Sequence, residues 1–171
     1  MTLSAVQPKA RTSRPRRSGP PHRQGRQPPD PALVVIVSTG ETVPASAVSR
    51  AVALSGGKPV AVVSLARIHR AALSLPSARN LPGPDEMCLH REVVDRALAS
   101  IERAGCEGWG QSGASRSPER AIARMASARG ARHVVVVVPA RSRSRRVMAG
   151  KMIRELGRRL AAGTTIEAVS H

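Results

Sequence analysis

The stretch VVVVVPARSRSRRVMAGK, Val134 to Lys151, carries the strongest structural signal in the chain. Five consecutive valines are typical of a strand that is covered on both faces of a sheet. Pro139 ends this apolar run, and four arginines follow before a helical pattern of apolar residues begins at Val147. The segment therefore predicts, in succession, a buried strand, a positively charged loop and a helix.

The same alternation of strand and helix extends through the rest of the chain. Apolar runs predict further strands at 33–37, 59–65 and 164–170, and a weaker strand at 106–113, which contains three glycines. Apolar residues three and four positions apart predict helices over 47–55, from 85 to 105, over 118–130 and over 147–161. Residues 66–84 give no clear assignment, apart from the option of a short helix over 70–75.

The second of these helices shows the clearest division into two faces. Asp85 is predicted to cap its N-terminus. Its apolar face is predicted to hold Leu89, Val93, Ala97, Leu98 and Ile101, and its polar face Arg91, Glu92, Asp95, Arg96 and Glu102.

Five strands with four intervening helices predict an α/β fold, with an open, five-stranded, mostly parallel sheet and helices on both faces. Ligands of such sheets bind at the carboxyl ends of the strands, where the strand order reverses. We expect this reversal between the strand at 33–37 and the valine strand. The turn STGE, residues 38–41, would then lie beside the arginine-rich loop.

The N-terminal segment differs in composition from the remainder. Residues 1–31 contain seven prolines, seven Lys or Arg residues and one acidic residue. Such a segment cannot bury enough apolar surface to offset its ordering entropy, so a disordered basic tail is predicted before a domain spanning 32–171. Two roles stay open for the tail: a solvated segment without a partner, or a nucleic-acid or ribosome contact through residues 9–26.

Charge and composition limit the classes of function. The net charge is +17 and 25 of the 28 basic residues are arginine, which favours polyanion binding, although a general preference for arginine codons would give the same composition. The chain has no Phe or Tyr and only Trp109, which argues against RNA recognition on stacked aromatic side chains. Trp109 itself is interpreted as a packing residue. Neither cysteine, Cys88 or Cys106, has metal-ligand spacing, and no apolar run suits a membrane helix, so a cytoplasmic protein without a metal is expected.

Over residues 32–170 the order of elements resembles the universal stress protein family. In that family the first strand ends in an Asp-Gly-Ser type of turn. The fourth strand leads into a Gly-x-x-Gly, nine-residue, Gly-Ser/Thr loop that binds the phosphates of ATP. Gly40 matches the glycine of the first turn, and Gly150 matches the last glycine of the loop. The resemblance implies a stress-response regulatory domain that binds nucleotide.

The departures from the family motif predict weak or altered nucleotide binding. Ser38 or Thr39 occupies the position of the aspartate. The first two glycines of the loop fall on Val137 and Ala140, or on Val138 and Arg141 after a shift of one residue, and the hydroxyl position is Lys151. A Cβ at the glycine positions obstructs the approach of backbone amides to phosphate. ATP or AMP stays open as a ligand, and no cofactor is certain.

Arginines can replace backbone amides, because a guanidinium pairs with phosphate through two hydrogen bonds. The predicted binding residues are Ser38, Thr39, Gly40, Val63, Ala140, Arg141, Arg143, Arg145, Arg146, Gly150 and Lys151. Glu41 is interpreted either as a ribose contact or as the start of the following helix.

No pattern predicts catalysis. The five histidines are scattered along the sequence, and His90 and His133 are interpreted as structural or solvent-facing, so a non-enzymatic protein is expected. The alternative function is an RNA- or ribosome-associated polyanion binder that uses the tail and the loop from Arg141 to Lys151. In the family the last strand often pairs with its counterpart in a second copy, so the resemblance also implies a homodimer through Thr165 to Val169.

Overall fold

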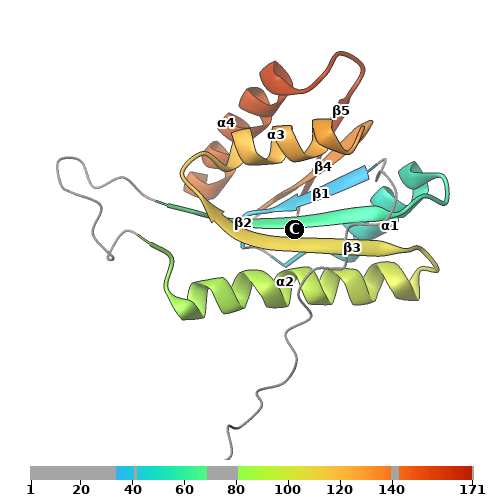
Figure 1. Cartoon of the computed structure of the whole chain (residues 1–171), viewed down its shortest axis with the longest axis horizontal. Coiled ribbons are helices and arrows are strands. Elements are labelled where there is room, and N and C mark those ends of the chain that lie inside the picture. Colours follow the sequence, from blue (N-terminus) through green and yellow to red (C-terminus); the bar gives the residue numbers. More distant parts are fainter. Residues whose placement is uncertain (1–33, 41, 69–80, 140–142, 171) are drawn as a thin grey trace, which may run out of the picture.

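The computed structural model describes residues 34–40, 42–68, 81–139 and 143–170. The predicted tail, residue Glu41 and the optional helix at 70–75 lie outside these residues. Strands and helices alternate along the described chain (Figure 1). Their bounds are β1 Val34–Ser38, α1 Ala45–Ser55, β2 Val60–Arg67, α2 Pro84–Arg103, β3 Gly108–Ser115, α3 Pro118–Ala128, β4 His133–Val138, α4 Arg143–Arg159 and β5 Thr165–Ser170.

The five strands form one parallel sheet in the order β3-β2-β1-β4-β5. The predicted reversal of strand order between β1 and β4 is confirmed. Helices α1 and α2 cover one face of the sheet and α3 and α4 cover the other, so the domain has three layers (Figure 1).

The sheet carries an apolar core on each of its faces. Val34 and Ile36 of β1 belong to the core beneath α1 and α2, whereas Val35 and Val37 belong to the core beneath α3 and α4. The predicted valine strand is confirmed as β4, in which 134–137 are buried. Full burial of a valine side chain contributes on the order of 1.5 kcal/mol or more, so these two central strands anchor the residues that follow them.

The glycine-rich stretch at 106–113 does form a strand, β3, and the structure explains its glycines. A Cβ added at Gly110 would lie 2.1 Å from Val94 Cγ1, and one at Gly108 would lie 3.0 Å from Leu98 Cδ2. Helix α2 therefore packs directly against the backbone of β3, which a larger residue at either position would prevent. The sequence signal for this strand is weak because packing selects residues that normally indicate turns.

Two details of α2 correct the prediction. The helix begins at Pro84 after Gly83, so Asp85 lies in the first turn, where its charge favours the helix dipole, and does not cap the helix. Leu89, predicted on the buried face, is 47% exposed, and the adjacent His90 is buried instead. The rest of the predicted face is confirmed, because Val93, Ala97 and Ile101 are buried and Leu98 packs against the core.

Helix α4 also begins earlier than predicted, at Arg143 and not at Val147. No glycine or proline lies between Arg141 and Val147, and arginine is a good helix former, so the helix extends toward its N-terminus. Arg143, Arg145 and Arg146 thus belong to the helix and not to a loop. None of the helices in the described segments has the length and apolar composition that crossing a membrane requires.

Candidate functional site

A cleft of about 520 Å³ lies at the carboxyl ends of β1 and β2. This volume is within the range of about 300–1,000 Å³ that is common for small-molecule sites. The cleft is next to the reversal of strand order, where parallel α/β sheets place their ligands. Its lining residues are Thr39, Gly40, Leu65, Ala66, Arg67, Glu86, Leu89, His90, Pro118, Met148, Ala149 and Met152.

The walls of the cleft combine apolar side chains with one charge of each sign. Leu89 of α2 and Met148 of α4 are 47% and 48% exposed. Exposed apolar side chains that gather at a concave surface are typical of ligand sites. Arg67 and Glu86 supply the charges, and Arg67 Nη2 also donates to Glu119 Oε2 at 2.9 Å.

His90 is a buried polar residue of the cleft. Its side chain is 3% exposed, and its Nδ1 lies 2.7 Å from the hydroxyl oxygen of the fully buried Ser64. Burial lowers the pKa of His90, and the negative charge of Glu86 opposes this shift in part. The imidazole is therefore neutral at neutral pH, and its Nε2 is the ring nitrogen nearest the turn at Gly40.

Gly40 is fixed both by its backbone and by its neighbour. Its φ is +97°, a conformation that L side chains rarely adopt. A Cβ at this position would lie 3.3 Å from both Cε1 and Nε2 of His90. The turn after β1 therefore needs glycine in order to pass over the imidazole.

The structure brings together only part of the predicted set of binding residues. Thr39 and Gly40 line the cleft. Ser38 is buried at the end of β1, opposite Ser64 in the parallel register, and Val63 is fully buried in the core beneath α3 and α4. Neither of these two lines the cleft.

The arginines of α4 are placed differently from the prediction. Arg143 and Arg146 are exposed, and α4 lines the cleft through Met148, Ala149 and Met152. Ala140, Arg141 and the side chain of Arg145 lie outside the described residues. Lys151 does not line the cleft but lines an adjoining depression of about 300 Å³, which shares Arg67, Met148 and Met152 with the cleft and also contains Glu119 and Glu155.

The segment that corresponds to the phosphate loop is mostly regular secondary structure. Val137 and Val138, the two alternatives for the first glycine, lie in β4 and pair with Val169 and Ser170 of β5. Gly150 is the eighth residue of α4. Only the first four N–H groups of a helix lack an acceptor within the helix, so the N–H of Gly150 is part of the helical ladder.

His90 was interpreted as structural or solvent-facing, and the structure shows it buried and hydrogen-bonded; its place in the cleft lining was not predicted. It lies on one helical stripe with the buried residues Val93, Val94, Ala97 and Ile101. A titratable residue on a buried stripe needs a polar partner, and this requirement is the signal that identifies it. The partner, Ser64, belongs to β2 and is 26 residues away, so the sequence does not reveal the pair.

Trp109 and His133, whose roles were interpreted from the sequence, are not part of the cleft lining. Trp109 is partly buried against the core, and the guanidinium carbon of Arg129 is 4.8 Å from the centre of its ring. His133 Nδ1 lies 2.6 Å from Thr165 Oγ1, which links β4 to β5. Among the residues that the structure describes, no cluster of three His, Cys, Asp or Glu residues is arranged to hold a metal ion.

A parallel sheet with β1 at its centre and a cleft at its carboxyl edge defines a doubly wound α/β domain. Comparison with solved structures gives a particular fold, that of universal stress proteins. A universal stress protein from Archaeoglobus fulgidus is 18% identical with a TM-score of 0.59, and the match covers 80% of this chain and 97% of that one. No protein-family model and no curated protein matches the sequence.

Two further matches are nucleotide complexes. The A. fulgidus universal stress protein in complex with dAMP is 17% identical with a TM-score of 0.56, over 80% of this chain and 96% of that chain. A universal stress protein in complex with cAMP is 17% identical with a TM-score of 0.53, over 82% and 98%. The chain therefore has the universal stress protein fold.

Proposed function

We propose that the chain is a universal-stress-protein-like regulatory domain that binds an adenine mononucleotide in the cleft and does not catalyse a reaction of it. The observation that carries this proposal is the cleft itself, with its apolar walls and a glycine turn beside a buried neutral histidine. Structures with the same fold hold dAMP and cAMP, which supports the choice of an adenine nucleotide.

The cleft suits the base and sugar of a nucleotide better than a chain of phosphates. Leu65, Leu89 and Met148 offer apolar contact area to a purine ring. Arg67 and Glu86 offer a hydrogen-bond donor and an acceptor for the polar edge of such a ligand. Burial of a flat, partly polar ring between apolar side chains with few polar contacts is the usual arrangement of a small-molecule site.

The phosphate side of the site is weak, and this supports altered nucleotide selectivity. The N–H of Gly150 belongs to the ladder of α4, and the valines that replace the first loop glycine belong to β4. Backbone amides at these positions cannot approach a triphosphate closely. AMP or cyclic AMP should therefore bind about as well as ATP.

The geometry also supports a binding function over an enzymatic one. The Ser64–His90 hydrogen bond resembles the pair of a serine nucleophile and its base. However, Ser64 is 0% exposed and does not line the cleft, so a substrate cannot reach its hydroxyl.

Cys88 and Cys106 are both free thiols, which fits a reducing compartment such as the cytoplasm.

Calorimetric titration with AMP, cyclic AMP and ATP tests the proposal. Leu89→Gln removes part of an apolar wall and should weaken AMP binding about fivefold, since half the burial energy of a leucine is about 1 kcal/mol. Leu81→Gln is the matched control, because Leu81 is 60% exposed and outside the cleft lining. Folded protein that gives no heat and no thermal shift at millimolar nucleotide would refute the proposal.

We also propose a homodimer through residues Thr165 to Val169. β5 is an edge strand of the sheet, and it is only six residues long. The N–H of Thr165 donates to the carbonyl of Arg132. Because N–H directions alternate along a strand, the N–H of Ala168 faces the free edge, where a second copy would pair.

A further inference from the structure

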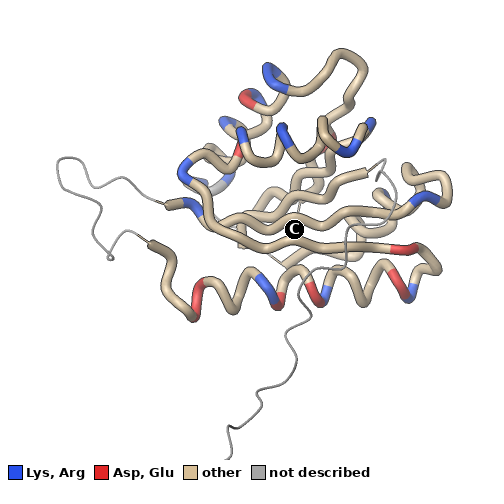
Figure 2. The backbone as a smooth tube through the Cα atoms, in the orientation of Figure 1, with Lys and Arg blue, Asp and Glu red and all other residues tan. Residues whose placement is uncertain are grey.

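Basic residues are concentrated on one face of the domain. The two helices α3 and α4 contain nine Lys or Arg and two Asp or Glu within their bounds, whereas α1 and α2 contain four and five. Figure 2 shows this contrast, with mostly blue segments on α3 and α4 and alternating red and blue on α2. Among the described helices, the excess of basic over acidic residues is therefore greatest in the α3–α4 layer.

A general preference for arginine does not explain this distribution. Such a preference would add arginine to both helical layers and would leave the acidic residues evenly divided. Instead, five of the seven acidic residues in the four helices are on α2. Relative to α1 and α2, the α3–α4 layer has five more basic residues and three fewer acidic ones, so both differences add to its positive charge.

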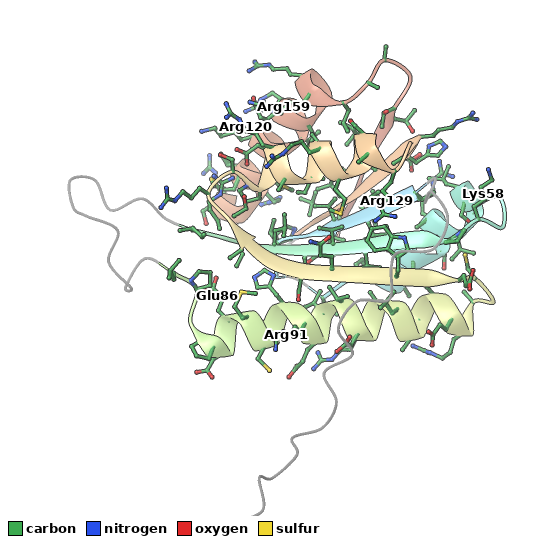
Figure 3. All side chains as sticks on the ribbon, viewed as in Figure 1. Lys58, Glu86, Arg91, Arg120, Arg129 and Arg159 are labelled. Carbon is green, nitrogen blue, oxygen red and sulfur yellow. The ribbon has the colours of Figure 1, made fainter. Side chains whose placement is uncertain are left out.

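A groove of about 730 Å³ runs between α3 and α4 at the centre of this basic face. Its lining is Arg120, Ala123, Arg124, Ser127, Arg158 and Arg159. Arg120 and Arg124 are one helical turn apart, a rise of about 6 Å. Arg120 and Arg159 lie close together at the outer surface of the two helices (Figure 3).

One carboxylate, that of Glu155, interacts with three of the four lining arginines. Glu155 accepts a hydrogen bond from Arg159 Nη2 and lies 3.5 Å from Arg158 Nη1. The hydrogen bond from Arg159 is the main reason why the pKa of Glu155 is lowered, and the charges of Arg159, Arg158 and Arg120 add to it. The groove lining itself holds four arginines and no acidic residue, so the groove is positive even with Glu155 beside it.

We propose that the α3–α4 groove binds the phosphodiester backbone of nucleic acid. Arginine fits this role because its guanidinium pairs with phosphate through two parallel hydrogen bonds. Ala123 is the only apolar residue of the lining, so the groove has no large apolar side chain to insert into a bilayer. Without an aromatic side chain in its lining, the groove cannot stack bases, and binding should be independent of base sequence.

This groove is separate from the nucleotide cleft and from the arginine-rich segment of the sequence. It shares no lining residue with the cleft at the strand ends. None of its arginines belongs to the stretch Arg141–Arg146. The proposal therefore stands or falls independently of nucleotide binding.

Fluorescence anisotropy with a labelled single-stranded RNA and a labelled duplex DNA, measured between low and moderate salt, tests the groove in the full chain. Arg120→Gln with Arg124→Gln should weaken binding to both and reduce the slope of log K against log salt by about 1.4 to 1.8, since each lost phosphate contact removes about 0.7 to 0.9. Arg91→Gln with Arg96→Gln removes the same charge from α2 and should leave the slope unchanged. Every variant keeps the basic residues before the described domain, so their contribution is constant.

Two results would overturn the proposal. If both double variants reduce the affinity and the slope equally, net charge drives the binding and the groove has no special part in it. If the groove variant loses binding to phosphatidylserine vesicles while its RNA and DNA binding is unchanged, the groove contacts anionic membranes instead. Circular dichroism of each variant verifies that a loss of binding does not reflect unfolding.

Discussion

Gly40→Ala tests the backbone turn that passes over His90 at the cleft. At φ +97° an alanine is strained, and its Cβ would press on His90 at 3.3 Å. A residue held in such a conformation costs about 1–3 kcal/mol. Alanine also restricts the unfolded chain more than glycine does, which offsets this cost by about 0.4–1 kcal/mol. The free energy of unfolding should therefore fall by about 1–2 kcal/mol. For a domain of this size the melting temperature should fall by about 3–8 °C.

Gly150→Ala is the matched control for this change. Gly150 lies inside α4, and an added Cβ would meet only Arg154 Nη1 at 3.9 Å. Alanine in a helix interior is about 0.8–1.0 kcal/mol more favourable than glycine, so this variant should be at least as stable as the unsubstituted chain.

Urea unfolding and AMP titration of the two variants provide the assay. We expect Gly40→Ala to be less stable and to bind AMP more weakly, and Gly150→Ala to retain binding. The reasoning is refuted if Gly40→Ala keeps full stability. It is also refuted if Gly150→Ala abolishes nucleotide binding, because the main chain at Gly150 would then take part in phosphate recognition.

The remaining predictions concern packing, protonation and assembly. Gly110→Ala should cost about 1–3 kcal/mol by overpacking against α2, whereas Gly113→Ala, whose Cβ would be 3.5 Å from its nearest neighbour, should be almost neutral; equal urea midpoints would contradict the packing account. Because the pKa of His90 is lowered in the folded state, the unfolded chain takes up a proton first as the pH falls through about 6.5. The free energy of unfolding, measured by chemical denaturation, should therefore decrease from pH 7 to pH 5. In His90→Asn, whose side chain at this position does not titrate, the decrease should be smaller. An identical pH dependence of the two proteins would show that His90 does not cause the decrease. Ala168→Pro should convert a dimer of twice the 18.0 kDa chain mass into a monomer by light scattering, and a concentration-independent monomer before substitution would disprove the dimer.

The central strands were predictable because their burial on both faces requires continuous apolar runs. Val34–Val37 and Val134–Val137 are buried throughout, and no alternative element suits five valines in succession. Because a helix lies between successive strands, the alternation then predicted that the strands run parallel. Edge strand β3 was harder to predict. Gly110 is required there because the side chain of Val94 leaves no room for a Cβ, although glycine has a low propensity for strands.

The cleft was predictable in position but not in composition. Gly40 was identified from its turn, and the structure places it at the cleft. The start of α4 was predicted four residues too late, because a run of serines and arginines has no apolar periodicity to reveal a helix. Met148 and Met152 line the cleft, and neither was predicted as a site residue. His90 depends on a hydrogen bond to Ser64 across two elements, which no local pattern reports.

A crystal structure of the protein soaked with ATP tests the central claim most directly. The account predicts an adenine ring between Leu89 and Met148, with phosphates that receive no hydrogen bond from the main chain at Gly150. A triphosphate held by backbone N–H groups around Gly150 would contradict it.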